Sequence, residues 1–178
     1  MATAPKRGKT MPLGTAAFLA GLVFVGLTLS QLLAGLVLIG LAALPSSQVS
    51  FPHADLVIER SDGQNFSFDV ELATTPEQKT RGLMFREAMP RDSGMLFLYE
   101  PGQPVAFWMM NTSIPLDMLF VRGDGAIIKI ASHTVPFSLA PINADEPVRA
   151  VIEINAGEAD RRDIHTGDKV VYPAFDGR

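Results

Sequence analysis

An apolar run near the start of the chain most constrains what this protein can fold into. From Leu13 to Leu44 no residue is charged. As a helix, with a rise of about 1.5 Å per residue, the run would be about 48 Å long, which exceeds the membrane hydrocarbon core of about 30 Å. The run therefore predicts a transmembrane helix over residues 13–44, preceded by a short tail over residues 1–12.

Basic residues predict how this helix is oriented. Lys6, Arg7 and Lys9 precede the run, and the next Lys or Arg is Arg60. By the positive-inside rule, the tail stays in the cytoplasm and the rest of this single-pass protein lies across the membrane. The alternative is a cleaved signal peptide and a secreted remainder. We favour the uncleaved anchor, because the apolar region of a signal peptide runs only about 7–15 residues.

The remainder of the chain differs from this segment in charge. All 19 acidic residues lie after residue 50, and the chain contains no Cys. An acidic domain without a basic stripe binds nucleic acid poorly, so we expect no nucleic-acid partner. We divide this part into a polar linker over residues 45–54, a folded domain over residues 55–173 and a C-terminal tail over residues 174–178.

Short apolar or alternating segments predict strands throughout the folded domain. Residues 56–60 and 65–73 flank an Asp-Gly pair that favours a tight hairpin turn. About eight short strands with regular turn signals between them favour a mainly β fold, a compact sandwich or small barrel, over alternating strands and helices. The other predicted strands cover residues 94–99, 105–110, 116–121, 126–131, 147–154 and 169–172.

One short helix is predicted within the β domain. Thr75 can cap it, Pro76 suits its first position, and Gln78 completes a capping box, after which Gly82 ends the helix. A single helical turn is expected over residues 158–164. The loop over residues 132–146 is long for a compact domain, which is more typical of a functional loop than of an idle one.

Polar residues interrupt the most apolar part of the domain. Trp108, Asn111, Thr112 and Asp117 lie within ten residues of one another, between and within two predicted strands. If they face one hollow, they form a pocket for a small polar ligand or an envelope partner. The alternative is that Trp108 packs in the core and that Asn111 and Thr112 satisfy backbone groups of the turn.

Asp117 needs a partner if it is buried among its apolar neighbours. Arg81, Arg86 and Arg149 are the candidates for a structural ion pair. The other interpretation is a functional carboxylate with a perturbed pKa. Both interpretations place Asp117 inside the domain.

A hydrolase is the alternative function. It would use Asp117 or Glu153 as general base, with His133 or an Arg as electrophilic partner, and it requires the two carboxylates to share an open cleft. The simpler interpretation is that Glu153 and Arg149 are solvated neighbours on one strand face. The simpler interpretation of His133 is an exposed loop residue. A third possibility is a scaffold without any ligand.

The sequence lacks the signatures of common catalytic sites. It has no dinucleotide-binding or phosphate-binding glycine motif and no HExxH, and its three His residues are scattered. We therefore assign no catalytic residue and expect no cofactor and no metal. The candidate ligand-binding residues are Arg81, Arg86, Trp108, Asn111, Thr112, Asp117, His133 and Glu153.

Linked motifs lie at residues 82–86, 94–97, 107–112, 114–117, 153–157 and 167–168. Together they resemble those of one known family, DUF192. The resemblance covers about residues 55–173 and implies a small prokaryotic domain, mainly β, often exported or anchored, with no established activity. The expected location is then the bacterial inner membrane, with the domain in the periplasm. Met110 stands where the resemblance leads us to expect Lys.

Overall fold

The computed structural model describes residues 49–175, which form one compact unit. The predicted anchor over residues 13–44 and the N-terminal tail lie outside the described residues. Within residues 49–175, no helix has the length and apolar character needed to cross a membrane.

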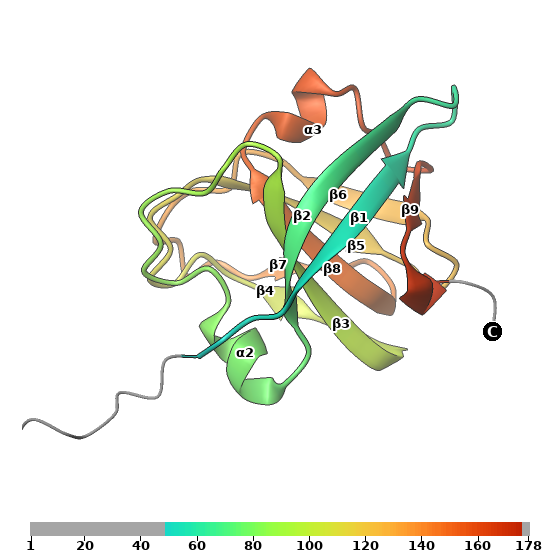
Figure 1. The fold of residues 1–178 in the computed structure, drawn as a ribbon. Coiled ribbons are helices and arrows are strands. Elements are labelled where there is room, and N and C mark those ends of the chain that lie inside the picture. Colours follow the sequence, from blue (N-terminus) through green and yellow to red (C-terminus); the bar gives the residue numbers. More distant parts are fainter. Residues whose placement is uncertain (1–48, 176–178) are drawn as a thin grey trace, which may run out of the picture. The chain divides into compact units, whose positions relative to one another are not determined.

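The domain is built on one seven-stranded sheet, with strands in the order β6-β5-β8-β3-β2-β1-β9 (Figure 1). A separate two-stranded ribbon pairs β4 (Ala106–Phe107) with β7 (Ile142–Asn143). The described part of the chain is therefore mainly β, as predicted. The strands of the large sheet are β1 (His53–Glu59), β2 (Asn65–Ala73), β3 (Ser93–Gln103), β5 (Leu116–Val121), β6 (Ile127–Ala131), β8 (Val148–Asn155) and β9 (Lys169–Val171).

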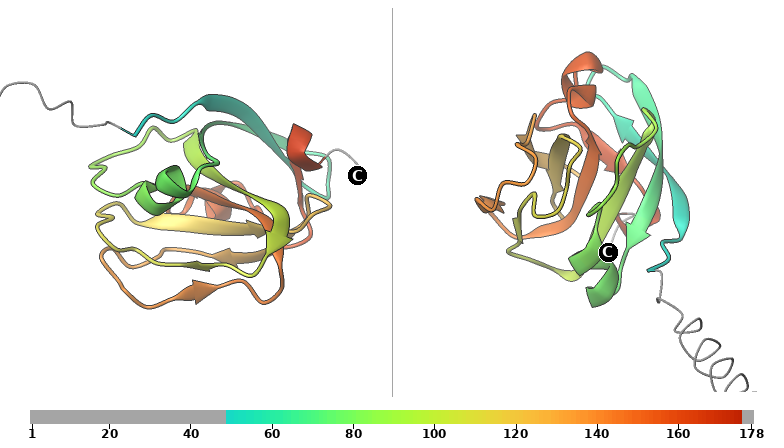
Figure 2. Two further views of the ribbon diagram at one scale, coloured as in Figure 1. Left: turned by 90° about the horizontal axis from the view of Figure 1, so that it is seen from below. Right: turned by 90° about the vertical axis from the view of Figure 1, so that its left-hand side faces the viewer.

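The large sheet curls into a half-barrel (Figure 2). Its two edges meet at one point, where Ala126, just before β6, forms a bridge with Lys169 of β9. The Val170 amide also donates to the Gly125 carbonyl oxygen at 2.8 Å. These contacts pair backbone groups that an open sheet edge would expose.

The predicted helix is confirmed as α2 (Pro76–Arg81). The Gln78 amide donates to the Thr75 hydroxyl at 3.2 Å, and the Thr75 amide donates to the Gln78 side chain at 3.0 Å, which completes the capping box. However, α2 connects β2 to a strand that runs parallel to it, β3. The sequence favoured a sandwich or barrel over alternating strands and helices, so this single β2-α2-β3 crossover was not predicted. Parallel strands need such a connection, because a tight turn cannot join them.

The predicted strand over residues 105–110 is mostly wrong. Only Ala106–Phe107 is extended and paired, as β4. The Met109 amide donates to Ser138 in the long loop, and Asn111 has a φ of 55°. Left-handed backbone is tolerated better by Asn than by most residues, so the chain turns at Asn111.

The sheet carries a hydrophobic core on each of its two faces. On what we call the α3 face, Ile152 and Ile154 pack with Ala159 of α3 (Glu158–Arg161). On what we call the α2 face, Phe120 and Val151 pack with Leu83 and residues of the ribbon. The central strand β8 is consequently buried on both sides, although its alternating pattern suggested one solvated face. The chain also forms a final short helix, η1 (Pro173–Phe175).

Candidate functional site

A cavity of about 160 Å³ lies on the α2 face of the sheet. Its walls come from the end of α2, from β3, from β4 and the turn that follows it, and from β8. Much of the lining is apolar, which is typical of small-molecule sites. The apolar lining includes Leu83, Met84, Phe97, Phe107 and Met110.

Sheet register places the Glu153 side chain on the face of the sheet where this cavity lies. Glu153 lies in β8 opposite Met95 of β3 and Met118 of β5, so its side chain shares the α2 face with theirs. Gly94 allows the strands to approach closely here, because a Cβ at that position would lie 2.6 Å from the Glu153 carbonyl oxygen. Glu153 is only 5% exposed.

The Glu153 carboxyl has no compensating partner among residues 49–175. No described hydrogen bond or ion pair reaches it, and burial alone raises its pKa to about 8. A buried carboxyl without a cation nearby takes up a proton, because the charged form loses its hydration. Glu153 is thus not the solvated neighbour of Arg149 that its strand position suggested. It is instead the kind of buried, perturbed group that marks functional sites.

Two further polar residues, Tyr99 and Lys79, line the cavity. Burial raises the pKa of the Tyr99 hydroxyl to about 12, and the charge of Glu153 adds to the effect. The Lys79 ammonium lies 4.4 Å from the centroid of the Tyr99 ring, and partial burial lowers its pKa. Tyr99 is therefore close to a buried acid and in contact with a partly buried base. Sequence reasoning singled out neither Lys79 nor Tyr99.

Trp108 and Thr112 line the cavity from the turn that follows β4. Trp108 is 51% exposed, so it is not a core residue. Thr112 is buried, and its hydroxyl donates to the Met110 carbonyl oxygen at 3.2 Å. Asn111 is exposed and lies outside the lining, with its carbonyl oxygen accepting from the Phe85 amide at 2.8 Å. The turn thus contributes an indole ring to the cavity but not the Asn111 amide group.

Asp117 lies on the α3 face, away from the cavity. It pairs with Ile154 across β5 and β8, and a side chain directly opposite Ile154 faces the other way from Glu153. One carboxylate oxygen accepts from the His133 amide at 2.9 Å and the other from the Ala159 amide at 3.0 Å. The predicted ion pair with Arg is wrong, because backbone donors satisfy the charge. The two carboxylates do not share a cleft, as the hydrolase hypothesis required.

The remaining candidates are also placed apart from the cavity, except Arg81. Arg86 pairs with Glu71 at 2.7 Å, and Arg149 pairs with Glu100 at 2.6 Å. His133 is largely exposed on its loop, and its ring lies 3.8 Å from Asp160. The cavity therefore brings together four of the predicted residues: Arg81, Trp108, Thr112 and Glu153.

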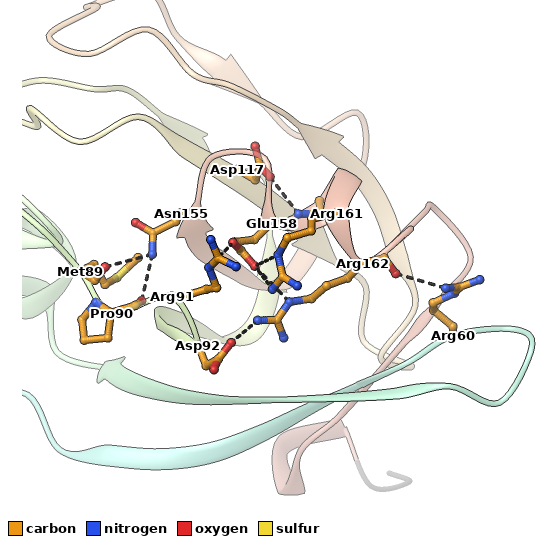
Figure 3. A network of polar contacts seen from close by, with 11 residues as sticks. Arg60, Met89, Pro90, Arg91, Asp92, Asp117, Asn155, Glu158, Arg161 and Arg162 are labelled. Carbon is orange, nitrogen blue, oxygen red and sulfur yellow. Dashed lines mark hydrogen bonds and ion pairs between the residues drawn. The ribbon is translucent and has the colours of Figure 1, made fainter.

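A second polar cluster lies near Asp117 around α3 (Figure 3). Glu158 contacts three guanidinium groups, from Arg91, Arg161 and Arg162. Burial alone would raise the pKa of Glu158, but hydrogen bonds from Arg161 and Arg162 hold it below its usual value. Arg162 also pairs with Asp92 and stacks 4.2 Å from the centroid of a Phe ring. Each charged side chain in this cluster contacts one of opposite charge, and Arg162 also packs on a ring of the sheet, so the cluster fixes α3 to the sheet.

Among residues 49–175, no group of three or more His, Asp or Glu side chains lies close enough together to hold an ion.

Comparison with known proteins decides the family. The sequence profile of the DUF192 family, described as "Uncharacterized ACR", matches residues 57–172. The chain belongs to the DUF192 family. A search of curated proteins found no match.

Two solved structures resemble the DUF192 domain of this chain. A crystal structure from Sinorhizobium meliloti, whose description proposes a transcription regulator, is 40% identical, covers 72% of this chain and 99% of its own, and has a TM-score of 0.70. A protein of unknown function from Novosphingobium aromaticivorans is 39% identical, covers 74% of this chain and 91% of its own, and has a TM-score of 0.67. The Sinorhizobium chain thus consists almost entirely of the matched region.

Proposed function

We propose that this DUF192 domain binds a small ligand in the cavity above Glu153. The observation that carries the proposal is the buried Glu153 carboxyl, which lines an open cavity without a partner among the described residues. The Glu153 carboxyl is buried within the domain but reaches the cavity, so a ligand bound there can form the hydrogen bond that the described chain does not supply. Apolar walls and a few converging polar groups complete the features expected of a ligand site.

Trp108 provides a direct test of ligand binding. It is the only Trp in the chain, and it lines the cavity while half exposed. We expect at least one compound of a small-molecule library to change the Trp108 emission of the full-length protein. The same compound should stabilise the fold, by about 2.7 kcal/mol at a concentration of 100 times its dissociation constant.

A variant that fills the cavity separates this site from others. Ala106 lines the cavity, and Ala106→Phe should remove both the emission change and the stabilisation. Ala140→Phe, on an exposed loop outside the lining, is the matched control and should retain both. A library without a single responding compound, or a response that persists in Ala106→Phe, contradicts the proposal.

We also propose that residues 13–44 anchor the domain in the bacterial inner membrane, with the domain on the periplasmic side. The support is the uncharged run and the basic residues before it. The chain should remain in the membrane pellet after an alkaline wash, and protease added to spheroplasts should digest the domain. Recovery of the chain in the periplasmic soluble fraction contradicts the anchor and favours signal cleavage. The acidic composition also argues against nucleic acid as a partner.

A further inference from the structure

The cavity has cations on one side whose charges are not neutralised within the described chain. Lys79 and Arg81 occupy the last turn of α2, and both line the cavity. Their described contacts are with rings: Lys79 with Tyr99, and Arg81 with Phe85 at 4.5 Å. Among residues 49–175, neither cation forms an ion pair. The cavity mouth is therefore electropositive although the domain as a whole is acidic.

Glu153 and Tyr99, which also line the cavity, are both protonated and can therefore donate hydrogen bonds. Glu153, buried and without a cation partner, carries a proton and so presents an O–H group. Tyr99 also keeps its hydroxyl proton. The hydroxyl of Thr112 is already directed to a backbone carbonyl oxygen. An ammonium, a guanidinium, a phenol and a carboxylic acid thus surround one space, and all of them can donate.

Such a site is complementary to a ligand group that only accepts hydrogen bonds and carries negative charge. A carboxylate fulfils both conditions, because its two oxygens accept hydrogen bonds from several donors. The apolar lining, including Met84, Phe97 and Met110, suits a hydrocarbon or aromatic body next to the charged end. The volume of about 160 Å³ restricts this body to a small one.

We propose that the ligand is a small carboxylic acid with an apolar body, bound as the carboxylate between Lys79 and the carboxyl hydrogen of Glu153. Arg81 adds positive charge at the mouth, and Trp108 covers the apolar body. This inference rests on the proposed function, since it assigns a chemical class to the ligand of the same cavity. A primary amine would instead need Glu153 to be charged. The affinity for an amine should therefore rise with pH, whereas the affinity for a carboxylate should fall.

The test compares probes of matched size by titrating Trp108 emission of the full-length protein. The probes are benzoate, benzamide, benzylamine and inorganic phosphate. At pH 6.5, benzoate should bind at least about tenfold more tightly than the other three, the difference expected for one hydrogen bond to a charged group. Its affinity should fall as pH rises above about 8, where Glu153 loses its proton. Lys79→Gln should weaken benzoate binding about tenfold, whereas Lys169→Gln on β9, outside the lining, should not change it.

Glu153→Gln is the decisive variant, because an amide N–H group replaces the carboxyl O–H group as donor. It should keep the affinity for benzoate at pH 6.5 within about threefold and abolish the loss of affinity above pH 8. Tighter binding of benzylamine, strengthening with pH and lost in Glu153→Gln, overturns the carboxylate class but leaves the cavity as a ligand site. Tighter binding of phosphate or benzamide than of benzoate likewise overturns the carboxylate class but leaves the cavity as a ligand site. If none of the four probes binds, the carboxylate class is overturned, and the library screen with Ala106→Phe decides separately on the proposed function.

Discussion

Two buried carboxyl groups on adjacent strands of this domain have opposite environments. Asp117 faces α3, where two backbone amides donate to its two oxygens. Glu153 faces the cavity on the other side of the sheet, and the described chain supplies no donor and no cation to it. The difference teaches that burial of an acid does not by itself identify a site. The number of protein partners separates a structural carboxylate from one that is free to bind a ligand.

The largest effect expected from this comparison is the loss of the Asp117 carboxylate. Asp117→Ala leaves two amides inside the domain, those of His133 and Ala159, without an acceptor. Each unsatisfied buried donor costs about 1–3 kcal/mol, so the free energy of unfolding should fall by about 3 kcal/mol. Urea denaturation of the purified protein measures this change.

Two further variants make this measurement specific. Asp117→Asn keeps one acceptor oxygen and should lose less stability than Asp117→Ala. Asp69→Ala removes an exposed carboxylate that pairs with His53, and it should change the unfolding free energy by no more than about 0.5–1 kcal/mol. If Asp117→Ala leaves stability unchanged and instead abolishes the Trp108 response to a ligand, the distinction between the two carboxyls is wrong.

A smaller effect, visible only as pH changes, is expected at Glu153. Its pKa is about 8 in the folded domain, against an ordinary value of 4.5. Between these values the folded state holds a proton that the unfolded state has lost, so stability falls as pH rises, by up to about 1.4 kcal/mol per pH unit. Glu153→Gln removes this dependence. Relative to the unmodified protein, the variant should gain about 2 kcal/mol or more between pH 5 and pH 8.

Denaturation midpoints from pH 5 to pH 9 provide this comparison. Other titrating groups, such as His53, contribute equally to both proteins and cancel in the difference. Glu87→Gln removes an exposed carboxyl, and its denaturation midpoints should change with pH in parallel with those of the unmodified protein. A constant difference between Glu153→Gln and the unmodified protein would show that the Glu153 carboxyl is charged in the fold.

Local sequence signals predicted most of the secondary structure. The capping box at Thr75 and Gln78 specifies α2 without help from distant residues. The Asp-Gly turn likewise specifies the β1–β2 hairpin, and β5 has the predicted bounds. The failure at residues 108–110 has a tertiary cause, since a hydrogen bond from Met109 to the long loop replaces strand pairing. The parallel pairing of β2 and β3 was not predicted either, because it joins strands connected by a helix and not by a tight turn.

The site was predicted less completely than the fold. Four of the predicted candidates line the cavity: Arg81, Trp108, Thr112 and Glu153. However, Asp117 was predicted at the centre of the site, whereas Glu153 is the acid that lines the cavity. Lys79 carried no signal beyond its place near a helix end, and Tyr99 carried none beyond its strand. Only the tertiary packing of α2 near β3 brings the Lys79 ammonium to 4.4 Å from the centroid of the Tyr99 ring.

By itself, the sequence determined most of the strands and helices, because hydrophobic period, capping and turn chemistry act between residues close in the chain. Its linked motifs also indicated the family. The tertiary structure alone decided which acid is satisfied and which faces a cavity. Sheet register places Asp117 and Glu153 on opposite faces. The long loop and α3, which cover one face, supply backbone donors to Asp117, whereas no described donor reaches Glu153 on the other.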